Sequence, residues 1–319
     1  MSMKRKILSL AAGFFLLCLL LLVSRHRSAP GEHLTAGFDA EFLTRPDGYP
    51  GLCVKYGFQF PHPPRQMDSG LMYRACADGA VDVINGFATD GRIPAYNLKV
   101  LEDDLGFFPP YHAAPLVRAE TLREHPELQQ VLERLSGQID DQEMRQLNLM
   151  VDEKGMKARD VARDYLQSKD LLKPGSGSSQ EKSGKVVVGG KQFTEQEILG
   201  EMLSILIEDT TDLKVTRRLN LGGTMICFNA LKAGDLDLYV EYTGTGLMNI
   251  LKRDPIRDPD EAFRQVHEAF QKEYDLLWLK PFGFNNTYTL TMKTENSQAL
   301  GIESISDLVA FLSEIGVRP

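Results

Sequence analysis

The chain has 319 residues, of which 43% are hydrophobic and 25% charged, and its formal net charge is −8 at pH 7. This is the composition of a soluble globular protein long enough for one large domain or two lobes. The acidic balance argues against nucleic-acid binding, which usually needs a basic stripe. With no CxxC and no cysteine–histidine cluster, Cys53, Cys76 and Cys227 are a poor basis for a disulfide framework or a zinc site, and we expect them to be buried small hydrophobic residues.

The N-terminus has the pattern of an export signal. Basic residues at 4–6 precede an apolar run over 7–23, which is short for a spanning helix without excluding one. We expect residues 1–30 to be a signal peptide or membrane anchor: uncleaved, cleaved near Ala29, or lipidated at Cys18, although Cys18 lies inside the run rather than at its end. Each alternative places the rest of the chain outside the cytoplasmic membrane, in the periplasm or at the cell surface.

The front block, residues 31–172, alternates strands with helices and ends in a run of helices. Hydrophobic periodicity predicts helices over 51–56 and 70–78, strands over 81–87 and 98–101, and helices over 120–135, 141–151 and 158–168. Glu102, Asp103 and Asp104 form an acidic loop. No matching ligand residues stand near them in the sequence, so they do not indicate a metal site.

A linker follows the front block. Residues 173–184 are polar and rich in Gly and Ser, which is typical of a flexible connection. The linker separates the front block from a rear block, residues 185–319. The two blocks are not repeats of each other, so the chain is not a tandem array.

The rear block has the pattern of an α/β unit. The β-branched run over 185–189 predicts a buried strand, and 194–209 predicts an amphipathic helix with Thr194 and Glu197 as a capping box. The alternation continues with a strand over 213–220, a helix over 224–233, a strand over 237–241, a helix over 259–274 and a strand over 288–292. This alternation favours a mostly parallel sheet covered on both faces, in which ligands bind beyond the C-terminal ends of the strands.

Several residues that could bind a ligand follow or flank the predicted strands. They are Arg45, Phe87, Tyr111, Lys191, Phe193, Tyr242, Thr245, Asn286 and Tyr288. Taken singly, an aromatic residue at a strand end is more often part of the core, and a lone Arg or Lys is more often solvated. The sequence holds no Gly-x-Ser-x-Gly, P-loop or His-Glu-x-x-His motif, and it does not predict an enzyme.

Longer motifs run through the whole exported part of the chain. In the rear block they are GKQFTEQ at 190–196, LNLGGT at 219–224, DLYVEYTGT at 237–245, WLKP at 278–281 and FNNTY at 284–288. In the front block they are RPDGYPGL at 45–52, ATDGR at 88–92, LEDD at 101–104 and FFPPY at 107–111. Together these motifs are specific: the exported part resembles the glycine betaine/choline/carnitine-binding proteins of osmoprotectant ABC transporters.

The order of the motifs differs from that family. The rear block resembles the family's first half and the front block its second half, so the chain resembles a circularly permuted member, engineered or natural, whose linker joins the family's old ends. The resemblance implies an α/β, two-lobe periplasmic-binding-protein (type II) fold. One lobe would be assembled from 31–103 and 282–319, and the second would run nearly continuously over 104–281.

The resemblance also implies roles for the candidate residues. A quaternary ammonium has no N–H to donate, so aromatic faces would hold it through cation–π attraction. The implied cage consists of Tyr242, Tyr288, Phe87 and Tyr111, with Phe193 adjoining and Asn286 positioning the head. Arg45, together with Lys191 and Thr245, would bind the carboxylate of a betaine. Because choline would leave Arg45 buried and unpaired, a betaine-like ligand is favoured.

The implied function is an extracytoplasmic substrate-binding protein that captures glycine betaine or a related betaine for ABC-transporter uptake. Its partners would be a permease and an ATPase, with no cofactor, no metal and no covalent chemistry. We expect a monomer that meets the membrane only through its N-terminal segment, and a hinge near 98–103 and 280–284 that closes the lobes on the ligand. The alternatives are a choline- or carnitine-specific protein, and a stand-alone binding module or sensor scaffold, which the permuted order favours. A hydrolase with a similar cleft would need a nucleophile beside a base, and the sequence offers no such pair.

Overall fold

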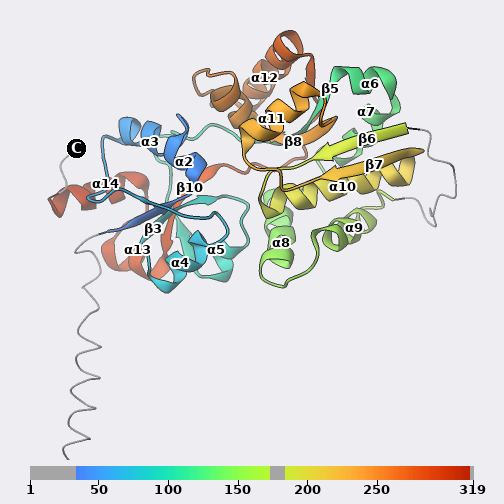
Figure 1. Cartoon of the computed structure of the whole chain (residues 1–319). Helices are drawn as coiled ribbons and strands as arrows, with labels where there is room; N and C mark the ends of the chain where they lie inside the picture. The colour runs from blue at the N-terminus through green and yellow to red at the C-terminus, as the bar shows by residue number, and fades with distance from the viewer. Residues whose placement is uncertain (1–33, 173–183, 317–319) are drawn as a thin grey trace, which may run out of the picture.

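The computed structural model describes residues 34–172 and 184–316, which form two α/β lobes lying side by side (Figure 1). The segment expected to be a signal or anchor and nearly all of the linker lie outside these residues. Helices cover both faces of each sheet (Figure 1). In the described ranges, no helix combines the length and the apolar character needed to cross a bilayer.

The first lobe is built on a sheet in the order β2-β1-β3-β10-β4. Its strands are β1 (Ala36–Phe38), β2 (Arg65–Gln66), β3 (Val83–Phe87), β4 (Leu98–Val100) and β10 (Tyr288–Lys293). Its helices are α2 (Ala40–Thr44), α3 (Tyr49–Tyr56), α4 (Met72–Asp78), α5 (Arg92–Ala95), α13 (Thr294–Leu300) and α14 (Ile305–Glu314). This lobe therefore combines the start of the front block with the end of the chain.

The second lobe has an equivalent sheet in the order β7-β6-β8-β5-β9. Its strands are β5 (Ala113–Arg118), β6 (Gly184–Gly189), β7 (Leu213–Arg218), β8 (Leu238–Tyr242) and β9 (Leu276–Trp278). Its helices are α6 (Ala119–Glu124), α7 (Glu127–Leu132), the 3₁₀ turn η1 (Glu133–Leu135), α8 (Asp141–Asp152), α9 (Ala158–Ser168), α10 (Thr194–Thr210), α11 (Thr224–Ala233), the π-helical η2 (Thr245–Ile250) and α12 (Pro259–Tyr274). Each sheet takes its strands from within one of the two ranges expected for the lobes, while the lobe boundaries themselves stay a prediction.

Both sheets are mostly parallel, as expected: four of the five strands in each run in one direction and one runs against them. β1 pairs in parallel with β2 and β3, and β6 pairs in parallel with β7 and β8. β10 is antiparallel to both β3 and β4, and β5 is antiparallel to both β8 and β9. The single antiparallel strand of each sheet follows from the path of the chain: β5 and β10 come after a crossing from the opposite lobe, and each runs against the direction of its neighbours.

Two crossing segments join the lobes, residues 101–112 between β4 and β5 and residues 279–287 between β9 and β10. They are hydrogen-bonded to each other. The Asn286 N–H donates to the Tyr111 carbonyl at 3.1 Å, and the Tyr111 N–H donates to Asn285 Oδ1 at 2.7 Å. The residues that begin β5 and β10 are therefore fixed relative to each other, and the hinge motion expected for these segments stays a prediction.

Two local expectations fail for identifiable reasons. The proposed capping box of Thr194 and Glu197 is wrong: the cap of α10 is Phe193, with no side-chain bond, and the Thr194 hydroxyl donates to Asp152 instead. The single helix expected over 120–135 is broken into α6 and α7 before Pro126, since proline lacks the N–H that a continuing helix needs.

The cores follow the hydrophobic pattern of the sequence. Helix α10 is buried from Glu195 to Ile207 except at Glu197, because it packs between its sheet and the helices α8 and α9. The cysteines of the described ranges are free; Cys76 and Cys227 are buried as predicted, whereas Cys53 is only half-buried. Packing of apolar side chains, without covalent links between cysteines, therefore holds these elements together.

Truncating the aromatic core of the second lobe should destabilise the protein. Phe270 is fully buried, with its ring edge-on to Trp278 at 5.4 Å between centroids and to Phe228 at 5.9 Å. We expect Phe270→Ala to lower the free energy of unfolding by about 3–5 kcal/mol, measured by urea denaturation. The control Val54→Ala, at a residue 85% exposed, should change it by no more than about 0.5 kcal/mol. Equal stabilities for the two variants would contradict this packing.

Candidate functional site

A cavity of about 430 Å³ lies between the lobes, a size ordinary for small-molecule sites. All nine residues singled out from the sequence line it: Arg45, Phe87, Tyr111, Lys191, Phe193, Tyr242, Thr245, Asn286 and Tyr288. Sequence reasoning missed the remaining lining residues: Asp39, Ala40, Glu41, Gln66, Met67, Asp68, Ser69, Gln192, Gly222 and Gly223. The fold thus gathers residues from both blocks of the chain around one space.

The strand register explains how the rings reach this cavity. Phe87 ends β3 and lies opposite Tyr288, which begins β10. Tyr242 ends β8 opposite Ala113, which begins β5, and Tyr111 stands two residues before Ala113 on the first crossing segment. The aromatic side chains therefore sit where the two sheets face each other across the junction of the lobes.

The rings form a continuous row. Tyr288 lies 5.6 Å from Tyr111 and 5.4 Å from Phe87, measured between centroids. The row continues from Phe87 to Phe193 at 5.9 Å and from Phe193 to Tyr242 at 6.3 Å. Burial raises the pKa of the three tyrosine hydroxyls well above its usual value, so the rings are neutral phenols at physiological pH. Such a row presents several electron-rich surfaces to one ligand.

Arg45 is already paired within the protein. It lies over the Tyr288 ring, and its Nε donates to Asp47 Oδ1 at 2.8 Å while a terminal nitrogen bonds the second Asp47 oxygen. The other terminal nitrogen donates to Glu41 at 3.1 Å, and Nη2 also donates to Thr245 at 3.1 Å. The guanidinium fork that was expected to bind a ligand carboxylate is thus occupied by Asp47, which the turn after α2 brings back against it.

Lys191 has an acidic partner of its own as well. Its Nζ donates to Glu241 at 2.6 Å, both side chains are buried, and the ammonium lies 5.1 Å from the centre of the Tyr242 ring. Glu241 also accepts a hydrogen bond from the Tyr239 hydroxyl at 3.0 Å. The cations of Arg45 and Lys191 are therefore neutralised by carboxylates that do not belong to a ligand.

Glu195 lies directly behind the cavity wall, and sequence reasoning gave it no role. It is 2% exposed in the first turn of α10 and accepts four hydrogen bonds. The donors are the hydroxyls of Thr89 at 2.5 Å and Tyr242 at 2.7 Å, and the side-chain amides of Asn286 at 2.8 Å and Asn148 at 3.1 Å. Burial raises the pKa of this carboxyl, and the hydrogen bonds act in the opposite direction.

Asp39 is a second acidic residue that was missed. It caps α2, where its Oδ1 accepts the N–H of Glu41 at 2.8 Å and of Phe42 at 3.0 Å, and Oδ2 accepts from the Asn85 amide. Burial raises the pKa of the Asp39 carboxyl. The sequence signal for this role was available, because Asp is a preferred helix cap, but α2 was not predicted.

Glu41 bridges the two lobes. Its carboxylate accepts the Thr224 N–H at 2.8 Å, at the N-terminus of α11, where the helix dipole favours a negative charge. The approach requires a glycine before Thr224, since a Cβ on Gly223 would lie 2.3 Å from Glu41 Oε1. Burial would raise the pKa of Glu41, but the cations of Lys191 and Arg45 and the hydrogen bonds from Thr224 and Arg45 together lower it, and the net shift is downward.

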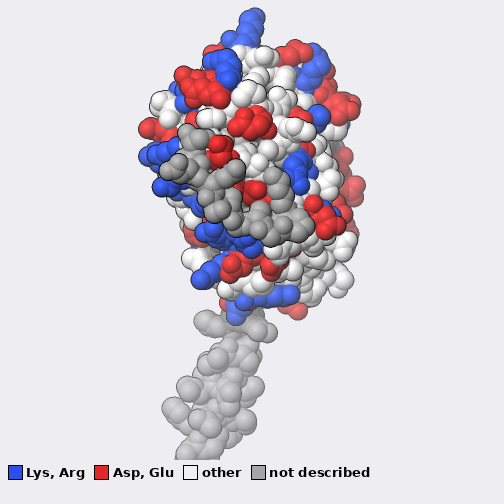
Figure 2. Space-filling model, turned by 90° about the vertical axis from the view of Figure 1, so that its right-hand side faces the viewer, with Lys and Arg blue, Asp and Glu red and all other residues white. Residues whose placement is uncertain are grey.

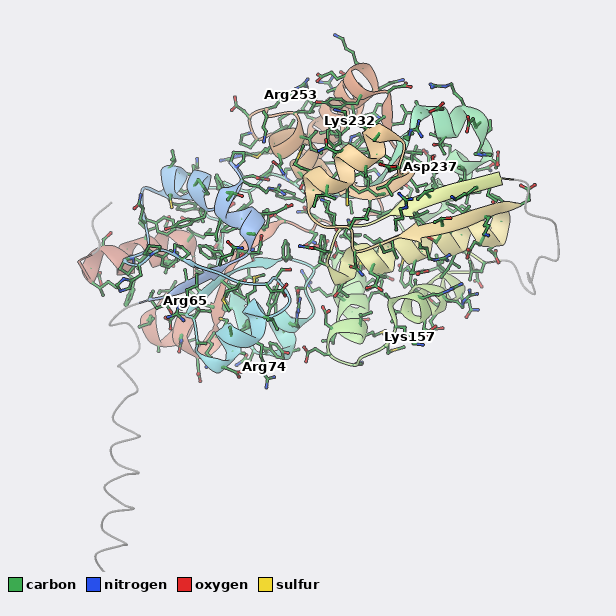
Figure 3. All side chains as sticks on the ribbon, in the orientation of Figure 1. Arg65, Arg74, Lys157, Lys232, Asp237 and Arg253 are labelled. Carbon is green, nitrogen blue, oxygen red and sulfur yellow. The ribbon has the colours of Figure 1, made fainter. Side chains whose placement is uncertain are left out.

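Several charged residues of the surface lie away from this cavity. Figure 3 shows Arg74 and Lys157 on the lower rim of the molecule and Arg253 on the upper rim. On the end face of the second lobe seen in Figure 2, basic and acidic side chains are interspersed, with no basic stripe. Residues 34–172 and 184–316 also contain no group of His, Cys, Asp and Glu arranged to hold a metal ion. The cavity with its aromatic row is therefore the candidate site.

Comparison with known proteins shows which family profile the chain matches. The profile described as the substrate-binding domain of ABC-type glycine betaine transport systems matches residues 24–168 and 184–318. A carnitine transport binding protein from Listeria monocytogenes is 42% identical over 151 residues, which is 47% of this chain and 48% of that protein. A glycine-betaine-binding protein from Pseudomonas aeruginosa is 37% identical over 163 residues, which is 50% of this chain and 52% of that protein.

A solved structure is also similar. The crystal structure of a glycine betaine/carnitine/choline ABC transporter is 40% identical over 44% of this chain and 52% of its own, with a TM-score of 0.35. All three matches span about half of this chain and about half of the protein that it matches.

Breaking the Arg45–Asp47 pair should destabilise the protein because both side chains are buried, Arg45 at 5% and Asp47 at 0% exposure. We expect Asp47→Ala to lower the free energy of unfolding by about 3–5 kcal/mol, since it strands a buried cation. The matched control is Asp78→Ala, which removes an exposed partner of Arg74 and should cost no more than about 1 kcal/mol. Thermal and urea unfolding measure the stabilities of both variants. An Asp47→Ala protein as stable as the Asp78→Ala control would refute the buried pair.

Proposed function

The chain belongs to the family of substrate-binding domains of ABC-type glycine betaine transport systems, and on this premise we propose that it captures a small quaternary-ammonium solute outside the cytoplasmic membrane for an ABC transporter. This is a family of transport proteins rather than enzymes. In our proposal, the cavity between the lobes is the capture site, a permease and an ATPase are the partners that complete uptake, and the chain itself carries out no covalent chemistry.

The convergence of aromatic rings from both lobes carries this proposal. Tyr288 and Phe87 come from the first lobe and Tyr242 from the second, and all three line the same cavity with Tyr111 and Phe193. A methylated ammonium offers no hydrogen to an acceptor, so ring faces are the groups suited to it. Each such contact contributes about 0.5–2 kcal/mol, and several together would give a useful affinity.

Contacts with both lobes would also couple binding to closure. Thr89 in the first lobe donates to Glu195 in the second, and Glu41 in the first lobe accepts from Thr224 in the second. A ligand that touches both walls binds the closed arrangement better than the open one and shifts the population toward it. The closed form is the one we propose for docking on the permease.

The geometry around Arg45 does not require a carboxylate at the end of the ligand opposite the ammonium. Arg45 uses its fork on Asp47 and two further N–H groups on Glu41 and Thr245, which leaves one of its five N–H groups for a ligand. The reason that favoured a betaine, an unpaired Arg45 in the presence of choline, therefore does not hold. Glycine betaine, carnitine and choline all belong to the ligand class proposed.

We also propose that the order of the chain is a circular permutation of the family order. The family profile matches in two separate pieces on either side of the linker. A stand-alone binding module is the second candidate function, because a permuted chain need not keep its permease. Uptake of a radiolabelled betaine by cells that lack their own osmoprotectant transporters would separate the two.

Calorimetry tests the capture site directly. We expect heat of binding with at least one of glycine betaine, carnitine and choline, and an affinity at least about tenfold weaker for Tyr242→Leu, since the substitution removes one ring face from the cage. The control is Tyr96→Leu, which changes the same residue type outside the cavity lining and should leave the affinity within about twofold.

No heat with any of the three solutes would remove the proposed ligand class. Equal affinities of the wild type and Tyr242→Leu would instead refute the place of Tyr242 in the cage.

A further inference from the structure

We propose that Glu195 is the buried counter-charge of the site, a positioning residue that makes the cavity select a cationic head over a neutral one of the same shape. This inference rests on the proposed function, because it assumes that the aromatic row receives the ligand's head. It assigns a role to a residue that does not itself line the cavity and acts on it through Tyr242 and Asn286.

The hydrogen bonds around Glu195 are those of an ionised carboxylate. A carboxylate accepts about four hydrogen bonds and donates none, and Glu195 receives four. The side-chain amide of Asn148 must point its NH₂ toward Glu195, because the same group donates to the Thr89 carbonyl, which can only accept. Asn286 is fixed likewise, since its carbonyl oxygen accepts the Thr89 N–H.

The negative charge has no cation of its own. Within residues 34–172 and 184–316, the partners of Glu195 are hydroxyls and amides, whereas Arg45 and Lys191 are bound to Asp47 and Glu241. The N-terminus of α10 offsets only part of the cost of burying this charge. A further positive charge near Glu195 would therefore be stabilising, and its donors Tyr242 and Asn286 line the cavity that could receive one.

Glu195 is linked to the cavity through two residues that are hydrogen-bonded to it. Tyr242 donates its hydroxyl to Glu195 at 2.7 Å, and Asn286 donates its amide at 2.8 Å, while both residues line the cavity. A cation against the Tyr242 ring would lie one side chain away from the carboxylate. In a buried setting of low dielectric, attraction between unit charges persists over such a distance. The carboxylate also orders the Tyr242 ring and the Asn286 amide, so it sets both the charge and the shape of the wall.

Pairs of ligands that differ only in charge test this inference. Choline is matched by 3,3-dimethyl-1-butanol, and glycine betaine by 3,3-dimethylbutanoate, in which carbon replaces the ammonium nitrogen. In the full chain we expect the wild type to prefer the ammonium member, and Glu195→Gln to reduce that preference at least about tenfold with little change for the neutral member. Glu197→Gln on the same helix is the control and should keep the wild-type preference.

The outcomes distinguish the possible failures. If Glu195→Gln weakens both members of a pair equally, its role is structural and the inference is overturned; an unchanged preference overturns it as well. Glu195→Asp keeps the charge and should retain most of the preference even if overall affinity falls. A wild type that binds both members equally would refute the inference without any variant. A wild type that binds no quaternary ammonium would instead refute the proposed function itself.

Discussion

The site depends on the register in which the two crossing segments enter the sheets. The backbone bonds between Tyr111 and Asn285–Asn286 hold the starts of β5 and β10 together. From there, antiparallel pairing sets Tyr288 opposite Phe87 in one sheet and Ala113 opposite Tyr242 in the other. A shift of one residue in either strand would turn its side chains to the opposite face and break the aromatic row. The one antiparallel strand in each otherwise parallel sheet is thus the feature that builds the cavity.

The pairing of the charged residues around the cavity also bears on which ligand it suits. Arg45 and Lys191 look like ligand-binding cations in the sequence, yet each is held by a buried carboxylate nearby. Asp39 and Glu195, in contrast, have hydrogen-bond donors but no ion pair among the described residues. The cavity lining, with Asp39, Glu41 and Asp68 against Arg45 and Lys191, therefore has more acidic than basic residues, and Glu195 behind it adds another, which suits a cationic head. This distribution and the ring faces act in the same direction, since both favour a positive ligand over a neutral one.

Much of this arrangement was predictable, because long motifs identify residues that lie at the ends of strands. The nine candidate residues were found by their place after strands and by resemblance, and all of them line the cavity. The short elements β1, α2 and β9 were not predicted, since runs of three to five residues give too little periodicity to recognise. Glu195 was overlooked for a different reason: an acidic residue in the first turn of a helix is usual, and only the fold shows that it is buried.

The central claim is that rings of both lobes enclose one methylated cation. A crystal structure with a bound trimethylammonium solute tests it most directly. Our account predicts the ammonium nitrogen within about 6 Å of the ring centres of Tyr111, Tyr242 and Tyr288. A ligand seated elsewhere, such as the hollow of about 550 Å³ that the crossing segments line with Phe108 and His112, would contradict it.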